Sequence, residues 1–346
     1  MSHEITQTNG HAEIACGSNK APWHGLGTVV DGLMTAKEAL TLAHLDWLVE
    51  PKPVTVNGKE LQFPDEESSD GWQGICRADT GDCLGITKGR YVPIQNVEAF
   101  DFFDALVGDG KAVYDTAGSL RGGKQVWLLA KVNGEVMING DAHREYALML
   151  TSHDGSHALQ VSWVMERVVC ANTLAIALRG QLNVVKIRHT ANWKDKEQEA
   201  RRVLGLGEKY YASIQEALAG MNDRLMSPEE MTEFSKLLVP AKDEKEVPTR
   251  TLNIREEIAA LFGKGAGNRG ASRWDALNAV TDYADHHATI RGSNSTRLQS
   301  SILGSGAQLK QRAFDLLTDE DIMGNLLKRP HVSVQVDSDF AALLNK

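Results

Sequence analysis

The sequence is poor in cysteine, proline and aromatic residues, and it has no long apolar run. Four cysteines among 346 residues are too few for a disulfide scaffold, so we expect free thiols in a reducing compartment. Apolar runs such as residues 126–130 fall far short of the ~20 residues that cross a bilayer. The start, Met1-Ser2-His3-Glu4, is polar and acidic, unlike a signal peptide. We therefore expect a soluble intracellular protein.

The chain is acidic overall, but its positive residues are unevenly distributed. A formal net charge of −9 argues against indiscriminate binding of nucleic acid or membranes by the whole surface. Residues 1–80 contain more than twice as many acids as bases, whereas residues 116–134, 167–194 and 286–313 contain bases and no acid. Because the local field steers an anion, these windows indicate either a phosphate-binding surface or chance clustering on a solvated face.

Local patterns predict an α+β protein. Capping boxes at Thr35 and Ser227 predict the starts of two helices, the first of which should run to about residue 47. Asn57-Gly58 predicts a hairpin, and residues 72–77 and 83–87 predict a second pair of strands. From residue 111 to 190 the apolar period is two, interrupted by a predicted short helix at residues 170–178. Hairpin-length links make this sheet antiparallel.

After residue 193 the pattern is mainly helical. Apolar residues step by three or four along residues 206–225, and Ser272 opens a further helix. We therefore divide the chain into an N-terminal α+β region (residues 1–110), an antiparallel sheet core (111–193), a helical region (194–290) and a flexible or helical tail (291–346).

Enzyme-like motifs are weak. The glycine-rich stretch 263–270 follows a predicted helix and lacks the order of a Walker loop. Asp282 and His286 share a helix face and form a metal site only with partners from elsewhere, such as His153 and Asp154. The alternative is a helix end where histidine meets the negative end of the dipole.

Cys170 is the one candidate nucleophile. His153, His157 or His189 would serve as its base, and Arg167 would lower its pKa. The alternative is a small buried hydrophobe, because Val168 and Val169 precede it. We expect no catalytic apparatus, no metal and no cofactor.

The strongest cluster is cationic and aromatic. Lys186 and Arg188 share one face of a predicted strand, and Trp127 shares a face with Lys131 on another. Cations that follow phosphates, together with rings that stack on bases, suit single-stranded nucleic acid. The alternative places Trp127 in the core and the lysines on a solvated rim. The predicted nucleic-acid-binding residues are Lys88, Arg90, Tyr91, Arg121, Lys124, Trp127, Arg167, Arg179, Lys186, Arg188, Trp193 and Lys194.

One string is specific enough to indicate a family. Arg167-Val168-Val169-Cys170-Ala171-Asn172-Thr173-Leu174 resembles a signature of the phage and plasmid-like family known as domain of unknown function 932. Further matching pieces lie in the family's order at residues 23–28, 90–96, 117–123, 152–156 and 274–286. The resemblance implies phage or plasmid cargo, and a curved antiparallel sheet with packed helices, similar to single-strand annealing recombinases. The Asn172-Thr173 pair has an alternative, structural role as the cap of the predicted helix 170–178.

Together these observations favour an ATP-independent protein that binds single-stranded DNA and anneals complementary strands for recombination or replication. Arg121, Lys124, Arg167, Arg179, Lys186, Arg188 and Lys194 would hold phosphates, and Tyr91, Trp127 and Trp193 would stack on bases. The resemblance implies a homo-oligomeric ring or filament in the cytoplasm of a bacterial host, with a host or phage single-strand-binding protein as a further partner. Two alternatives stay open: a metal-dependent hydrolase or nucleotide-modifying enzyme built on His153, Asp154, Asp282 and His286, and a host-interaction or anti-defence protein.

Overall fold

The computed structural model describes residues 5–17, 26–60, 71–107, 113–167, 172–174, 184–196, 207–289, 300 and 304–326. The chain forms two compact units. Unit 1 comprises Met1–Gly134, Tyr146–Trp163 and Leu182–Gly207, and unit 2 comprises Glu135–Glu145, Val164–Gln181 and Glu208–Lys346. Each unit combines separate stretches of sequence, so this division differs from the four consecutive regions expected from the sequence.

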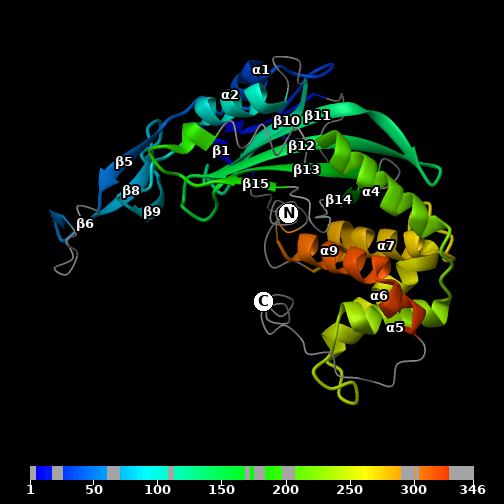
Figure 1. The fold of residues 1–346 in the computed structure, drawn as a ribbon. Coiled ribbons are helices and arrows are strands. Elements are labelled where there is room, and N and C mark those ends of the chain that lie inside the picture. The colour runs from blue at the N-terminus through cyan, green and yellow to red at the C-terminus, as the bar shows by residue number, and fades with distance from the viewer. Residues whose placement is uncertain are drawn as a thin grey trace. The chain divides into compact units, whose positions relative to one another are not determined.

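The main sheet confirms the predicted α+β class. It has eight strands in the order β14-β13-β12-β11-β10-β3-β4, and β15 also pairs with β13 (Figure 1). The pairs β10-β11, β10-β3, β13-β14 and β13-β15 are antiparallel, whereas β3 and β4 are parallel. The strands are β3 (Ile14–Cys16), β4 (Thr28–Val29), β10 (Val113–Leu120), β11 (Gln125–Ile138), β12 (Asp141–Ser152), β13 (Leu159–Arg167), β14 (Asn172–Leu174) and β15 (Val184–Ile187).

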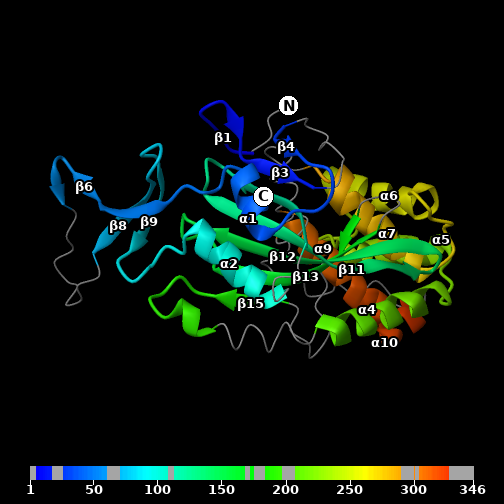
Figure 2. The same ribbon diagram turned by 90° about the horizontal axis from the view of Figure 1, so that it is seen from above.

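Smaller sheets complete the strands of unit 1. Asn57 and Gly58, with φ of 53° and 76°, link two short strands, as expected for a hairpin turn that needs positive φ at both central positions. The three-stranded sheet β5-β8-β9 confirms the second predicted strand pair and lies beyond the ends of the long strands of unit 1 (Figure 2). These strands are β1 (Gln7–Thr8), β2 (His11–Ala12), β5 (Val49–Pro53), β6 (Thr55–Val56), β7 (Lys59–Glu60), β8 (Trp72–Arg77) and β9 (Cys83–Lys88).

Two helices cover one face of the sheet in unit 1: α1 (Ala36–Leu42) and α2 (Asn96–Val107). The Thr35 capping box is formed as predicted, but α1 ends well before residue 47. His44 adopts a φ of 53°, and the Leu45 amide donates back to the Leu40 carbonyl, which is the left-handed helix stop usually made with glycine. Tyr114 of β10 faces α2, where its hydroxyl donates to Asp104 at 2.6 Å.

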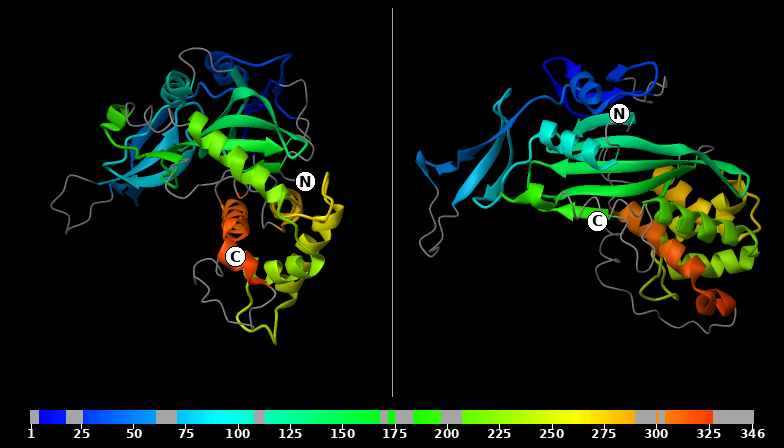
Figure 3. Two further views of the ribbon diagram at one scale, coloured as in Figure 1. Left: turned by 45° about the vertical axis from the view of Figure 1, so that its right-hand side comes forward. Right: turned by 45° about the horizontal axis from the view of Figure 1, so that its top comes forward.

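Unit 2 is mainly helical, and its helices pack on one another (Figure 3). Every residue from Arg273 to Thr281 of α7 is buried, so α7 forms the centre of this packing. The capping box at Ser227 is formed as predicted, and Ser272 begins the predicted further helix, where it forms a box with Asp275. The helices are α4 (Gly207–Asn222), α5 (Pro228–Leu238), α6 (Thr249–Lys264), α7 (Arg273–Asp282), the π-turn η2 (Tyr283–His287), α9 (Ser305–Thr318) and α10 (Glu320–Gly324).

The prediction of a short helix at residues 170–178 is wrong where the structure describes that segment. Asn172–Leu174 form β14, in register with Met165–Arg167 of β13, so the Asn172-Thr173 pair does not begin a helix. The reason is non-local: β15 pairs only with residues 159–162 of β13, which leaves the remaining edge open to another strand. Cys170 and residues 175–178 lie outside the described residues.

Candidate nucleic-acid interface

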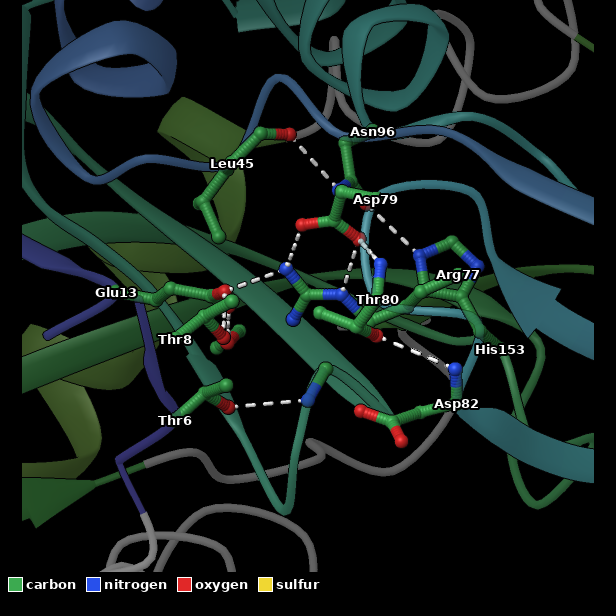
Figure 4. Close-up of polar contacts among 12 residues, drawn as sticks. Thr6, Thr8, Glu13, Leu45, Arg77, Asp79, Thr80, Asp82, Asn96 and His153 are labelled. Carbon is green, nitrogen blue, oxygen red and sulfur yellow. Dashed lines mark hydrogen bonds and ion pairs between the residues drawn. The ribbon is translucent and has the colours of Figure 1, made fainter. Parts of the chain in front are cut away.

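A buried ion pair joins the β5-β8-β9 sheet to the main sheet within unit 1 (Figure 4). The Arg77 side chain, 2% exposed, places Nη2 2.7 Å from Glu13 Oε1. The same guanidinium forms two hydrogen bonds to Asp79, of 2.9 and 2.7 Å, and lies 4.1 Å from the centre of the Trp47 ring. The bond to Arg77 holds the pKa of Asp79 below its usual value.

Glu13 extends this contact to the turn between β10 and β11. Its carboxylate accepts hydrogen bonds from the hydroxyls of Ser119 and Thr8. Residues 121–123 of the turn all have positive φ, and the Gly123 amide donates to Thr6 Oγ1 at 3.0 Å. The turn that carries Arg121 and Lys124 is therefore fixed by buried polar contacts.

A buried histidine fixes the neighbouring turn, residues 153–157, between β12 and β13. The side-chain NH2 group of Asn96 donates to the Leu45 carbonyl at 2.9 Å. This leaves the side-chain oxygen of Asn96 as the acceptor for His153 Nε2 at 2.8 Å. His153 therefore carries its proton on Nε2. The Asn96 side chain joins these two segments.

The 153–157 turn is also held by its neighbours. The His153 amide donates to the Lys124 carbonyl at 2.8 Å, so the two turns lie side by side. Gly85 of β9 packs so closely that a methyl group there would lie 2.6 Å from the Asp154 Cα. Tyr91 donates from its hydroxyl to the Ser152 carbonyl at 2.7 Å and stacks on His189 at 4.7 Å between ring centres.

Cations from two of the acid-free windows meet at this end of the sheet. Burial lowers the pKa of His157, and the positive charges of Arg121 and Lys186 lower it further, against the opposing effect of Asp154. Arg121 and Lys186, which are far apart in the sequence, therefore both lie near His157, together with Asp154.

Lys186 of β15 and Arg188, just after the strand, both face outward. Val185 and Ile187 are buried, whereas Lys186 and Arg188 are exposed, as the predicted alternation requires. Neither cationic side chain forms a hydrogen bond or an ion pair with any residue that the structure describes. The backbone near Arg90 and at Lys124 lies close to these elements, because the Val92 amide donates to the His189 carbonyl and the His153 amide donates to the Lys124 carbonyl. We call Arg90, Arg121, Lys124, Lys186 and Arg188 the sheet-end cations.

Two predicted stacking residues belong to the core. Trp127 is 6% exposed and Trp193 is 5% exposed, so neither ring offers a face to a base. The Trp127 ring covers Gly118 of β10, where a methyl group would lie 2.3 Å from Cη2. Trp193, in the 3-10 turn η1 (Trp193–Lys196), packs edge-on against Phe102 at 5.6 Å.

The other predicted cations have different surroundings. The Lys194 ammonium lies 2.8 Å from the Glu98 carboxylate, so its charge is matched. Arg167 ends β13 in unit 2 and its side chain is not described, and Arg179 lies outside the described residues. Lys88 lies 5.8 Å from the ring of Trp72, which stands opposite it on β8. Trp72 was not among the predicted binding residues. A bulge between Ile75 and Cys76 shifts the register of the predicted strand pair by one residue and brings Trp72 opposite Lys88.

The residues of the metal-site alternative are divided between the units. His153 and Asp154 belong to unit 1, whereas Asp282 and His286 belong to unit 2. No group of three or more metal-binding side chains occurs among the residues with a described position. The amides of Arg269 and Ala271 in the glycine-rich loop donate to the Asp275 carboxylate, so this loop's own aspartate takes the place that a phosphate would have.

Comparisons with known proteins give one match. The model of a family described as "Domain of unknown function (DUF932)" matches residues 83–303, well over half of the chain. Searches of curated proteins and of solved structures found no significant match. Among the described helices, none combines the length and apolar character that crossing a membrane requires.

Replacing Arg77 with methionine tests the buried ion pair. The substitution leaves the Glu13 carboxylate buried without its cation, which costs about 3–5 kcal/mol when one partner of a buried pair is removed. We expect the urea midpoint of unit 1 to fall accordingly, as monitored by tryptophan fluorescence. The control Lys52→Met breaks the exposed pair with Glu50, where the side chains are 49% and 55% exposed, and should change stability by less than about 1 kcal/mol. Equal midpoints for the two variants would contradict the assignment.

The buried histidines predict an acid-sensitive fold. Burial lowers the pKa of His153 to about 3 and of His189 to about 4, against about 6.5 in an unfolded chain. Between these values the unfolded state binds more protons, so the free energy of unfolding falls as the pH decreases from about 6.5 to 4. The slope approaches about 1.4 kcal/mol per pH unit for each histidine.

Urea unfolding at several pH values measures this slope. His153→Gln should reduce the slope by the share of one histidine. A slope that is the same in wild type and His153→Gln would show that the acid sensitivity has another origin.

Proposed function

The chain belongs to the DUF932 family, whose description names no activity, and we propose that it binds single-stranded DNA and anneals complementary strands without hydrolysing a nucleotide. The observation that carries the proposal is the exposure of Lys186 and Arg188, neither of which forms an ion pair with a residue that the structure describes. They support a local positive field on a chain whose formal net charge is −9. Such a field attracts a polyanion to one place and leaves the rest of the surface repulsive.

The origin of the cations on several elements favours an extended polymer over a small anion. The sheet-end cations come from the loop after β9, the turn between β10 and β11, and the end of β15. Lys186 and Arg188 lie on one strand face, about 7 Å apart at the rise of about 3.4 Å per residue. Contacts of this kind position a phosphate backbone without reading its sequence.

Partly exposed rings beside the cations favour a single strand over a duplex. Tyr91 follows Arg90, and Trp72 stands opposite Lys88. Unpaired bases offer their faces to such rings, with a gain of about 1–3 kcal/mol per stacked base, whereas paired bases are already stacked. Annealing then needs neutralised phosphates and accessible base edges, and no bond is made or broken by the protein. We include assembly into a ring or filament along the strand in this proposal.

Charge reversal on β15 tests binding. Lys186→Glu with Arg188→Glu should weaken binding of a fluorescent oligothymidine by one to two orders of magnitude at low salt, measured by anisotropy. Because each phosphate contact to a single strand contributes about 0.7 to the slope of log K against log salt, losing two contacts should make that slope about 1.4 less steep.

The matched control is Lys242→Glu with Lys245→Glu. This pair makes the same change in net charge at two exposed positions of the linker in unit 2, and it should leave the affinity within about twofold of wild type. If both pairs weaken binding equally, total charge governs the interaction and the sheet-end cations are not the interface.

Annealing is tested with complementary oligonucleotides that carry a donor and an acceptor dye. The wild-type protein should accelerate duplex formation without ATP and without a divalent cation, and the β15 double variant should not. Electron micrographs with and without the oligonucleotide should show rings or filaments that depend on the strand. Tight binding without acceleration would reduce the proposal to strand protection, and monomers that do not bind would end it.

A further inference from the structure

Two cysteines face each other across the β8-β9 pair. Cys76 and Cys83 are register partners in this antiparallel ladder, with a bulge between Ile75 and Cys76. Directly opposed residues in such a ladder have Cα atoms about 4.5–5.5 Å apart, within the range of about 4.4–6.8 Å that a disulfide requires. The backbone therefore needs no rearrangement to bring these two thiols into bonding range.

The side chains also point to one place. A methyl group placed on Gly74 would lie 3.4 Å from the Cys83 Sγ and 3.8 Å from the Cys76 Sγ. Both sulfurs thus lie on the same face of the sheet, above the glycine that leaves them room. The third described cysteine, Cys16, is buried on β3.

We propose that Cys76 and Cys83 form a dithiol site that peroxide oxidises to an intramolecular disulfide and that thiols reduce again. This proposal is independent of the proposed function. Cys83 is exposed and Cys76 is buried, so peroxide reaches Cys83 first. Burial, with a further effect from Cys83, raises the pKa of Cys76, which makes Cys76 the resolving thiol.

The two steps balance with hydrogen peroxide as the oxidant. The Cys83 thiolate attacks one peroxide oxygen, the O–O bond breaks, and hydroxide leaves to give a sulfenic acid. The Cys76 sulfur, losing its proton, then attacks the sulfenic sulfur, and the S–O bond breaks with loss of hydroxide, which takes up that proton as water. Overall, two thiols become one disulfide and the peroxide becomes two waters.

Peptide mapping tests the proposal on the full-length protein. After brief exposure to hydrogen peroxide, alkylation and trypsin, cleavage at Arg77 separates the two cysteines into peptides 60–77 and 78–88. We expect these peptides to be joined, with a loss of two hydrogens from the intact mass and of two alkylated thiols, and dithiothreitol should separate them. Separate alkylation of both peptides, or a link from Cys83 to Cys170, would overturn the assignment.

Variants distinguish the two roles. In Cys76→Ser, dimedone should trap a sulfenic acid on Cys83, whereas in Cys83→Ser the buried Cys76 should stay unmodified under the same exposure. The control Cys16→Ser should form the 60–77 to 78–88 link to the same extent as wild type. A dimedone adduct on Cys76 in the Cys83→Ser variant would reverse the order of reaction and refute the assignment of roles.

Discussion

Unit 1 depends on the neutralisation of one buried positive charge. Burying a guanidinium without a partner costs several kcal/mol. Arg77 is paired with Glu13 and Asp79. Glu13 comes from the N-terminal strands, whereas Asp79 comes from the turn after β8. The ion pairs therefore form only when segments more than sixty residues apart in the sequence have folded together. Their formation thus depends on the tertiary structure of unit 1.

The same contact determines how the surface above it is built. Glu13 binds Ser119 next to the β10-β11 turn, and the Lys124 carbonyl in that turn binds the His153 amide. His153 stays neutral because burial lowers its pKa, and a neutral imidazole can donate to Asn96 without adding charge. Arg121 and Lys124 are thus carried by a turn that uncharged or internally balanced polar groups hold in place. A cation on a fixed turn loses less entropy on binding than one on a mobile loop.

Local chemistry explains what the sequence could predict. The capping boxes at Thr35, Ser227 and Ser272 and the Asn57-Gly58 turn need only residues a few positions apart, and each is formed. The alternation that placed Lys186 and Arg188 on one face is equally local. The end of α1 was missed because His44 adopts a conformation usually given to glycine. The strand β14 was missed because the free edge of β13 depends on where β15 stops. Arg77 has no local signal beyond a charged residue at the end of an apolar strand.

The burial of Trp127 and Trp193 changes the balance of forces in the proposed interface. With both rings in the core, stacking is left to Tyr91 and Trp72, and one face of Tyr91 is already covered by His189. Affinity must then come mainly from phosphate contacts, which release counterions and carry no sequence information. A protein that anneals strands needs this combination. It must hold any strand by its backbone, and it must hold the bases weakly enough that a complementary strand can take them, because a base stacked firmly between two rings could not pair.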